Sequence, residues 1–166
     1  MTMNDQVHNT DAYQLRNFAA QALEQSGRNP NDIQLFPNVD GMENGYARAR
    51  EALKDRLTFD AAFAGNFTSA VGVMLAILDG GYRIPEDVAM VAQGETELSP
   101  FTPVPMTTVS LAEKEVLRAG FDLLLTQIRN PEDRAPRRIL FEPILEIRHS
   151  TVPRTNLSED RLKRRP

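Results

Sequence analysis

The feature that most constrains the fold of this chain is the segment AFAGNFTSAVGVMLAILDGGYRIPEDVAMV, residues 62–91. A short apolar run at 59–64 is followed by Asn66, which can cap a helix, and an apolar helical pattern then continues to Gly80. A second apolar run follows at 88–91. The segment therefore predicts a strand, a helix, a turn and a strand, which is the repeating unit of a parallel sheet.

The rest of the chain extends the alternation of helix and strand. A proline-rich stretch at 99–109 is typical of an extended crossover, and Ser110 with Glu113 forms a capping box that begins a long amphipathic helix. The further predicted elements are helices at 11–27, 42–57 and 110–129, a strand at 33–36, and two short strands within 137–150 that are hinged at Pro143. We therefore expect an α/β fold with a mostly parallel sheet and helices on both faces.

The composition excludes several kinds of functional site. The chain has 166 residues and no cysteine, which rules out a disulfide scaffold, a thiolate zinc site and a cysteine nucleophile. Its two histidines, His8 and His149, are far apart in sequence, and the chain has no Walker, GxSxG, HExxH or GxGxxG motif. We therefore predict no enzyme activity, no catalytic residues, no metal ligands and no cofactor.

The charge distribution argues against nucleic-acid binding by this chain alone. The formal net charge is −4, whereas DNA-binding surfaces are basic. Basic residues cluster at 161–166, with a smaller pair at Arg137 and Arg138, and we expect 153–166 to be a flexible basic tail. No apolar run is long enough to span a membrane, and residues 1–11 lack the apolar segment of a secretory signal. These features predict a cytoplasmic protein.

The candidate binding residues lie where two predicted strands end. Ligands of parallel sheets bind outside the carboxyl ends of the strands, which here are Gly65–Asn66 and 92–95. The Asn66 side chain can cap the following helix or hydrogen-bond a ligand at the mouth of a cleft, and both roles can hold at once. Other polar residues are interpreted as solvated or packing groups rather than as a catalytic pair: Asp60, Glu95, Glu97 and His149.

Three linked stretches carry a resemblance to a known family: DAAFAGNFTSAVGVMLAILDGGYRIPEDVAMVAQGE, PFTPVPMTTVSLAEKEVLRAGFDLLLTQI and RRILFEPILEIRHSTVPR. The matching positions, in place and order, are Asp60, Asn66, 84–88, 107–109, Pro143, Arg148, Ser150 and Thr151. The chain resembles the C-terminal sensor half of LacI/GalR-type (lac-repressor-like) transcriptional regulators. The resemblance covers roughly residues 9 to 153 and rests on several motifs at the right spacing.

The resemblance implies a periplasmic-binding-protein-like fold and a regulator that works as a dimer. Members of the family have an N-terminal helix-turn-helix, and a small effector in the cleft between two sensor lobes shifts their affinity for operator DNA. This chain resembles a truncated regulator, with the effector lobe and the helix that completes the other lobe. We accordingly expect a disordered N-terminal remnant at 1–10, an incomplete effector-binding and dimerisation domain at 11–152, and the tail at 153–166.

The resemblance also implies which residues contact the effector. The predicted effector site comprises Asn66, Phe67, Gln93, Gly94, Glu95, Leu15 and Arg16. Phe67 and Gly94 stand where the family has aspartates, and Leu15 stands where it has an arginine. A site with fewer polar groups discriminates hydroxylated ligands poorly. The family implies a small-molecule effector, a sugar or a related metabolite, whose identity the sequence does not name. The departures predict a ligand less polar than an ordinary sugar, or no effector.

The function predicted from the sequence is effector sensing and dimerisation within a LacI-family DNA-binding regulator, with operator DNA bound by a domain absent from this chain. An alternative is a soluble solute-binding protein of the same fold that binds a sugar for a transporter. A second alternative, a small α/β enzyme, lacks a nucleophile–base pair and a metal cluster. The long helix at 110–129 is expected to expose an apolar face, which favours self-association.

Overall fold

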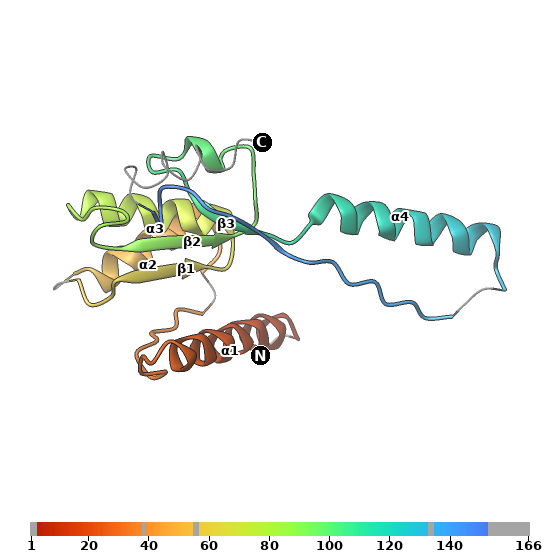
Figure 1. The fold of residues 1–166 in the computed structure, drawn as a ribbon, viewed down its shortest axis with the longest axis horizontal. Coiled ribbons are helices and arrows are strands. Elements are labelled where there is room, and N and C mark those ends of the chain that lie inside the picture. Colours follow the sequence, from red (N-terminus) through yellow and green to blue (C-terminus); the bar gives the residue numbers. More distant parts are fainter. Residues whose placement is uncertain (1–2, 38, 55–56, 133–134, 153–166) are drawn as a thin grey trace. The chain divides into compact units, whose positions relative to one another are not determined.

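The computed structural model describes residues 3–37, 39–54, 57–132 and 135–152 of the chain (Figure 1). Contacts within the chain define two compact units, Met1–Asp40 and Gly41–Pro166. The predicted tail at 153–166 lies outside the described residues, so its flexibility stays a prediction, as do the domain limits. Among the described residues, no helix combines the length and the apolar composition that crossing a membrane requires.

The first unit contains helix α1, Met3–Gln25. The predicted glycine cap is confirmed, because Gly27 has φ +74° and the amide of Arg28 donates to the Leu23 carbonyl at 2.9 Å. The helix begins before residue 11, so residues 3–10, expected to be disordered, have a helical backbone. The strand expected at 33–36 is wrong, since residues 32–37 have no regular structure. An apolar run becomes a strand only where a neighbouring strand pairs with it, and this unit has none among its described residues.

Two helices of the second unit pack closely against each other. They are α2, Gly41–Ala52, and α3, Phe67–Asp79. The approach depends on glycine, since a Cβ atom on Gly45 would come within 3.0 Å of the Ser69 backbone. Helix α2 ends before the predicted residue 57, although Leu53 still donates its amide to the Ala49 carbonyl and packs into the core.

The sheet of the second unit is mostly parallel, as predicted. Its strands are β1 Ala61–Ala64, β2 Ala89–Gln93, β3 Thr107–Ser110 and β4 Ile144–Glu146, in the spatial order β1-β2-β3-β4. The first three strands are parallel, and β4 runs antiparallel to β3. Of the two strands expected within 137–150, the structure forms β4, and the described residues before Pro143 form none.

The hydrophobic core lies between α3 and the sheet. Its fully buried side chains include Met74 and Ile77 from α3, Met90 from β2 and Met106 at the entry to β3. Among the other apolar residues of α3, Val71, Leu75 and Leu78 are half-buried. The buried face of α3 is broad, because the helix packs against α2 as well as against the sheet.

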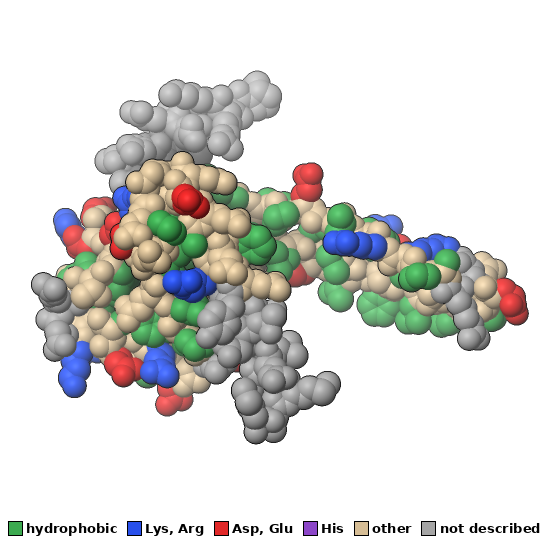
Figure 2. Space-filling view, turned by 90° about the horizontal axis from the view of Figure 1, so that it is seen from below, with side chains coloured by type: hydrophobic (Ala, Val, Ile, Leu, Met, Phe, Trp, Pro, Cys, Tyr) green, Lys and Arg blue, Asp and Glu red, His purple; other side chains and the backbone are tan. Residues whose placement is uncertain are grey.

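Helix α4, Glu113–Arg129, has no buried residue. Its exposed apolar side chains are Val116, Leu117, Phe121, Leu124, Leu125 and Ile128, and hydrophobic side chains gather along this part of the molecule in Figure 2. The predicted capping box at Ser110 is wrong, because the helix begins at Glu113 after Ala112, which has φ +54° and caps it without a side-chain bond. Ser110 is the last residue of β3, and its hydroxyl donates to the Glu113 carboxylate at 2.9 Å. The exposed apolar face of this helix is therefore a feature of the described structure.

Candidate functional site

The carboxyl ends of β1 and β2 lie next to each other. The two strands are parallel, and Ala64 pairs with Ala92 at their carboxyl ends. Asn66, two residues after β1, and Gln93, the last residue of β2, are therefore placed at the same edge of the sheet. The arrangement inferred from the sequence is confirmed, whereas the binding role of these residues stays a prediction.

Asn66 caps helix α3, as the sequence predicts. Its Oδ1 accepts a hydrogen bond from the Ser69 amide at 2.8 Å and others from the hydroxyls of Ser69 at 2.8 Å and Thr68 at 3.0 Å. Its backbone is extended, with φ −152° and ψ 156°, which suits a residue that precedes a helix. The cap fixes the direction of the Asn66 side chain at the edge, so it is held in place before any ligand arrives.

The neighbouring candidates differ in what they present at this edge. The Phe67 ring is buried in the hydrophobic core, and its expected part in the effector site stays a prediction. Gly94 has φ +94°, a conformation that side chains rarely adopt, and its amide donates to the Val109 carbonyl at 2.9 Å. Gln93 is half-buried, and within the described residues no hydrogen bond of its side chain is recorded.

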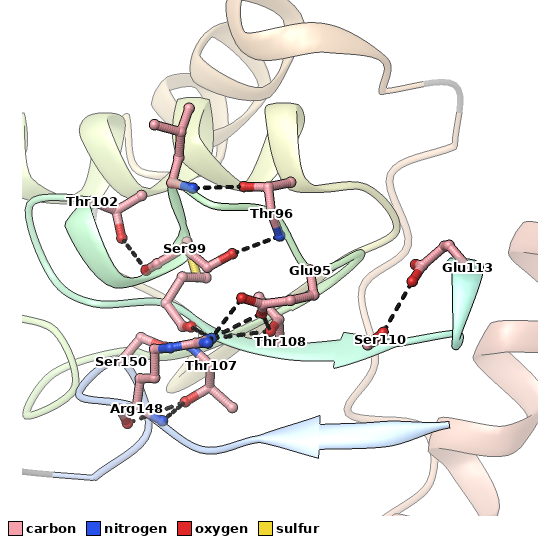
Figure 3. Close-up of polar contacts among 12 residues, drawn as sticks. Glu95, Thr96, Ser99, Thr102, Thr107, Thr108, Ser110, Glu113, Arg148 and Ser150 are labelled. Atoms are coloured by element: carbon pink, nitrogen blue, oxygen red, sulfur yellow. Dashed lines mark hydrogen bonds and ion pairs between the residues drawn. The ribbon is translucent and has the colours of Figure 1, made fainter. Parts of the chain in front are cut away.

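Glu95 is paired with Arg148 (Figure 3). Arg148 Nη1 and Nη2 donate to the two carboxylate oxygens at 3.0 Å and 2.9 Å. Arg148 Nη1 also donates to the Met106 carbonyl at 2.9 Å, and the Thr108 hydroxyl bonds to the Glu95 carboxylate as well. Glu95 is therefore part of an ion pair and not the solvated charge expected from the sequence, whereas its expected contact with an effector stays a prediction.

The segment that contains Arg148 also joins β2 to β3. The Ser150 hydroxyl accepts from the Thr107 amide at 2.7 Å and donates to the Met90 carbonyl at 2.6 Å. The Ser150 amide donates to the Pro105 carbonyl at 2.9 Å, and its carbonyl accepts from the Met90 amide at 2.8 Å. Sequence reasoning missed this role. The one signal was that Arg148 and Ser150 match the closing motif of the resembled family.

The remaining candidates add no catalytic arrangement. The Nδ1 atom of His149 is buried without a hydrogen-bond partner among the described residues. In that part of the chain, no group of three or more His, Cys, Asp or Glu residues is placed to hold a metal ion. Leu15 and Arg16 lie on α1, in the first compact unit, and their predicted part in the effector site stays a prediction.

Comparisons with known proteins agree with this architecture. The model of the periplasmic binding protein-like domain matches residues 2–151. The ribose operon repressor of Escherichia coli is 28% identical over 130 residues, which are 78% of this chain and 39% of that repressor. A LacI family transcriptional regulator from Enterococcus faecium, solved with bound ribose, has a TM-score of 0.71 at 25% identity, over 80% of this chain and 48% of that one.

A third similar protein is the lac repressor dimer, solved bound to operator and the anti-inducer ONPF. It shares the fold at 24% identity, with a TM-score of 0.60 over 67% of this chain and 38% of that one. The chain thus spans less than half of the length of each of these three proteins. It belongs to the periplasmic binding protein-like domain family, in the form that LacI-type transcriptional regulators have as their sensor domain.

Proposed function

We propose that this chain is the effector-sensing and dimerisation part of a LacI-type regulator, with a small sugar or related metabolite as effector. Two of the similar proteins support the ligand class, since one is a ribose operon repressor and another was solved with bound ribose. The solved lac repressor dimer bound to operator supports a homodimer and operator DNA as partners of the whole regulator. A cytoplasmic location and a non-catalytic role are parts of the same proposal.

The effector site that we propose is the edge formed by Asn66, Gln93 and Gly94. The observation that carries the proposal is that two adjacent parallel strands end there with fixed polar groups. Asn66 is fixed by the cap of α3, and the turn after Gln93 is fixed by the pair of Glu95 with Arg148. Preorganised groups of this kind bind a ligand without first losing side-chain freedom.

The direct contacts proposed here are fewer than those predicted from the sequence. Glu95 acts indirectly in this proposal, because its carboxylate is already bound by Arg148 and Thr108. Phe67 contributes shape through its buried ring rather than a hydrogen bond. A half-site with few free polar groups suits a ligand that makes further contacts with a second lobe.

The proposed mechanism is a population shift. An effector that contacts this edge and a second lobe favours the arrangement in which both contacts are made. The size of the population shift is limited by the difference between the effector's affinities for the two arrangements. The DNA-binding part of the regulator responds to the shift through a change in its affinity for DNA. This chain supplies one side of the cleft and, in the dimer, one copy of the sensor.

The test is a thermal melt of the purified chain with D-ribose, with glycerol at the same concentration as the control. A ligand at 100 times its Kd adds about 2.7 kcal/mol to the free energy of unfolding, which raises Tm by several degrees. Gln93→Ala should abolish the shift with little change in the unliganded Tm, whereas Glu97→Ala, at an exposed neighbouring position, should keep it.

A second pair of variants separates capping from binding at Asn66. Asn66→Ser keeps an oxygen that can accept from the Ser69 amide, so the unliganded Tm should change little. The same variant removes the side-chain amide, so it should weaken the response to ribose. The proposal is overturned if the folded chain shows no shift with ribose, other pentoses, hexoses or nucleosides.

A further inference from the structure

The strand ends at the proposed effector edge carry a single charged side chain. Residues 64–67 and 92–95, where β1 and β2 end, contain one charged residue, Glu95. Glu95 directly follows Gly94, which belongs to the proposed edge. The charge that these strand ends present to a ligand therefore depends on how the Glu95 carboxylate is paired.

Arg148 neutralises the Glu95 carboxylate through two hydrogen bonds (Figure 3). Nη1 and Nη2 each donate to a different carboxylate oxygen, at 3.0 Å and 2.9 Å. The Thr108 hydroxyl donates to the same carboxylate and accepts from Arg148 Nη1 at 3.1 Å. The Glu95 and Arg148 side chains are 27% and 18% exposed, so the two charges are balanced mainly by each other and not by water.

Arg148 is also held by groups other than Glu95. Its Nη1 donates to the Met106 carbonyl at 2.9 Å, and its amide donates to the Thr107 hydroxyl at 2.9 Å. Loss of the carboxylate would therefore leave a cation at this place, whereas loss of the guanidinium would leave the Glu95 anion with the Thr108 hydroxyl. Two single replacements thus change the charge beside the edge in opposite directions.

We propose that Arg148 is a specificity-determining residue of the effector edge. Its pairing with Glu95 leaves no unpaired charge at the strand ends, which selects an uncharged polyhydroxyl ligand over a cationic amine. A protonated amine that binds there gives up part of its hydration, and these strand ends offer no unpaired carboxylate in exchange. A hydroxyl group in the same position gives up less hydration. The inference rests on the proposed function and narrows its ligand class.

Isothermal titration calorimetry of the full chain with D-ribose and 2-amino-2-deoxy-D-ribose tests this role, at a slightly acidic pH that keeps the amine protonated. The two ligands differ at one group, so the ratio of their Kd values, amine over ribose, measures charge selection. In the wild type the ratio should be above one. Arg148→Gln leaves the Glu95 anion and should lower the ratio about tenfold. Glu95→Gln leaves the Arg148 cation and should raise the ratio or abolish amine binding.

The double variant with Glu95→Gln and Arg148→Gln separates charge selection from structural damage. It lacks both charges, so its ratio should return to within about threefold of the wild-type value. A loss of stability alone weakens both ligands together and leaves the ratio unchanged. Glu97→Gln is the matched control, because Glu97 is exposed and water screens its charge, and it should keep the wild-type ratio.

The outcomes distinguish this inference from the proposed function. A wild type that binds D-ribose, with the same ratio in the wild type, both single variants and the double variant, overturns the role of Arg148 alone. A wild type that prefers the amine also contradicts that role and leaves a small-molecule effector in place. A wild type that binds neither ligand overturns both the inference and its ligand class.

Discussion

Arg148 binds the carboxylate of Glu95 with both terminal nitrogens, at 3.0 Å and 2.9 Å, across 53 residues of sequence. The side chains are 18% and 27% exposed, so the pair is only partly screened by water. It ties the turn after β2 to the segment after β4. In the sheet, β3, the strand that leads into α4, lies between β2 and β4. The pair therefore connects the proposed effector edge to the part of the chain that leads to α4.

Replacement of Arg148 by lysine should destabilise the second unit. Lysine keeps the charge but loses the planar fork that binds two carboxylate oxygens and the Met106 carbonyl together. The expected loss in the free energy of unfolding is about 2 kcal/mol, measured by urea denaturation. Arg83→Lys is the control, because Arg83 pairs with Asp87 at the surface with 70% of its side chain exposed, and it should cost clearly less than Arg148→Lys. Equal losses in the two variants would contradict the special role of Arg148.

The local elements of the second unit were predictable from the sequence. Asn66, a residue type that caps helices, predicts the start of α3. The apolar runs on either side of that helix form β1 and β2, because the two runs pair with each other as parallel strands. The adjacency of their carboxyl ends follows from that pairing. Periodicity and the Asn66 cap are short-range signals, and they were sufficient for this strand, helix and strand. The same kind of signal placed the start of α4 at Ser110, three residues too early.

Long-range contacts were not predictable in the same way. Nothing local to Glu95 or Arg148 shows that they meet, since a charge pair of this separation depends on the fold of everything between them. The run at 33–36 has the apolar character of a strand, but the described residues of its unit contain no strand for it to pair with. The burial of Phe67, too, follows from how α3 rests on the sheet rather than from its place after Asn66.

Gly72→Ala should disrupt the packing of α2 on α3. A Cβ atom there would overlap the Met42 carbonyl oxygen and come within 2.7 Å of the Tyr46 nitrogen, and both are backbone atoms that cannot turn away. The expected loss is about 1–3 kcal/mol in the free energy of unfolding. Gly120→Ala is the matched control, because no atom lies within 4 Å of its Cβ, and it should raise the helix content of α4. A Gly72→Ala variant as stable as the wild type would show that the two helices can move apart at little cost.

The pair of Asp87 with Arg83 predicts a pH-dependent contribution to stability. Hydrogen bonds from the Arg83 side chain, at 2.7 Å and 2.9 Å, and from its amide at 2.8 Å lower the pKa of Asp87 to about 2. Because the folded-state pKa lies below the unfolded value of about 4, the contribution is present above about pH 4 and is lost as the pH falls toward 2.

Asp87→Asn should therefore be less stable than the wild type near neutral pH, with the difference narrowing below about pH 4 in urea titrations. Glu86→Gln, at an exposed neighbour, should follow the wild-type profile, and a difference for Asp87→Asn that is constant with pH would contradict the assignment.

The chain should bind DNA only weakly and without sequence preference. Its net charge is −4, and its one dense basic cluster is at 161–166, so few phosphates can be neutralised. Fluorescence anisotropy with a labelled duplex of about two helical turns should give a Kd of about 10⁻⁴ M or weaker at physiological salt. Added salt should abolish this binding, because the release of counterions from the phosphates drives it. Replacement of Arg161, Lys163, Arg164 and Arg165 by glutamine should remove most of the remaining affinity. Tight binding that survives moderate salt would instead require a DNA-reading surface within these 166 residues, and would contradict the assignment of operator recognition to another part of the regulator.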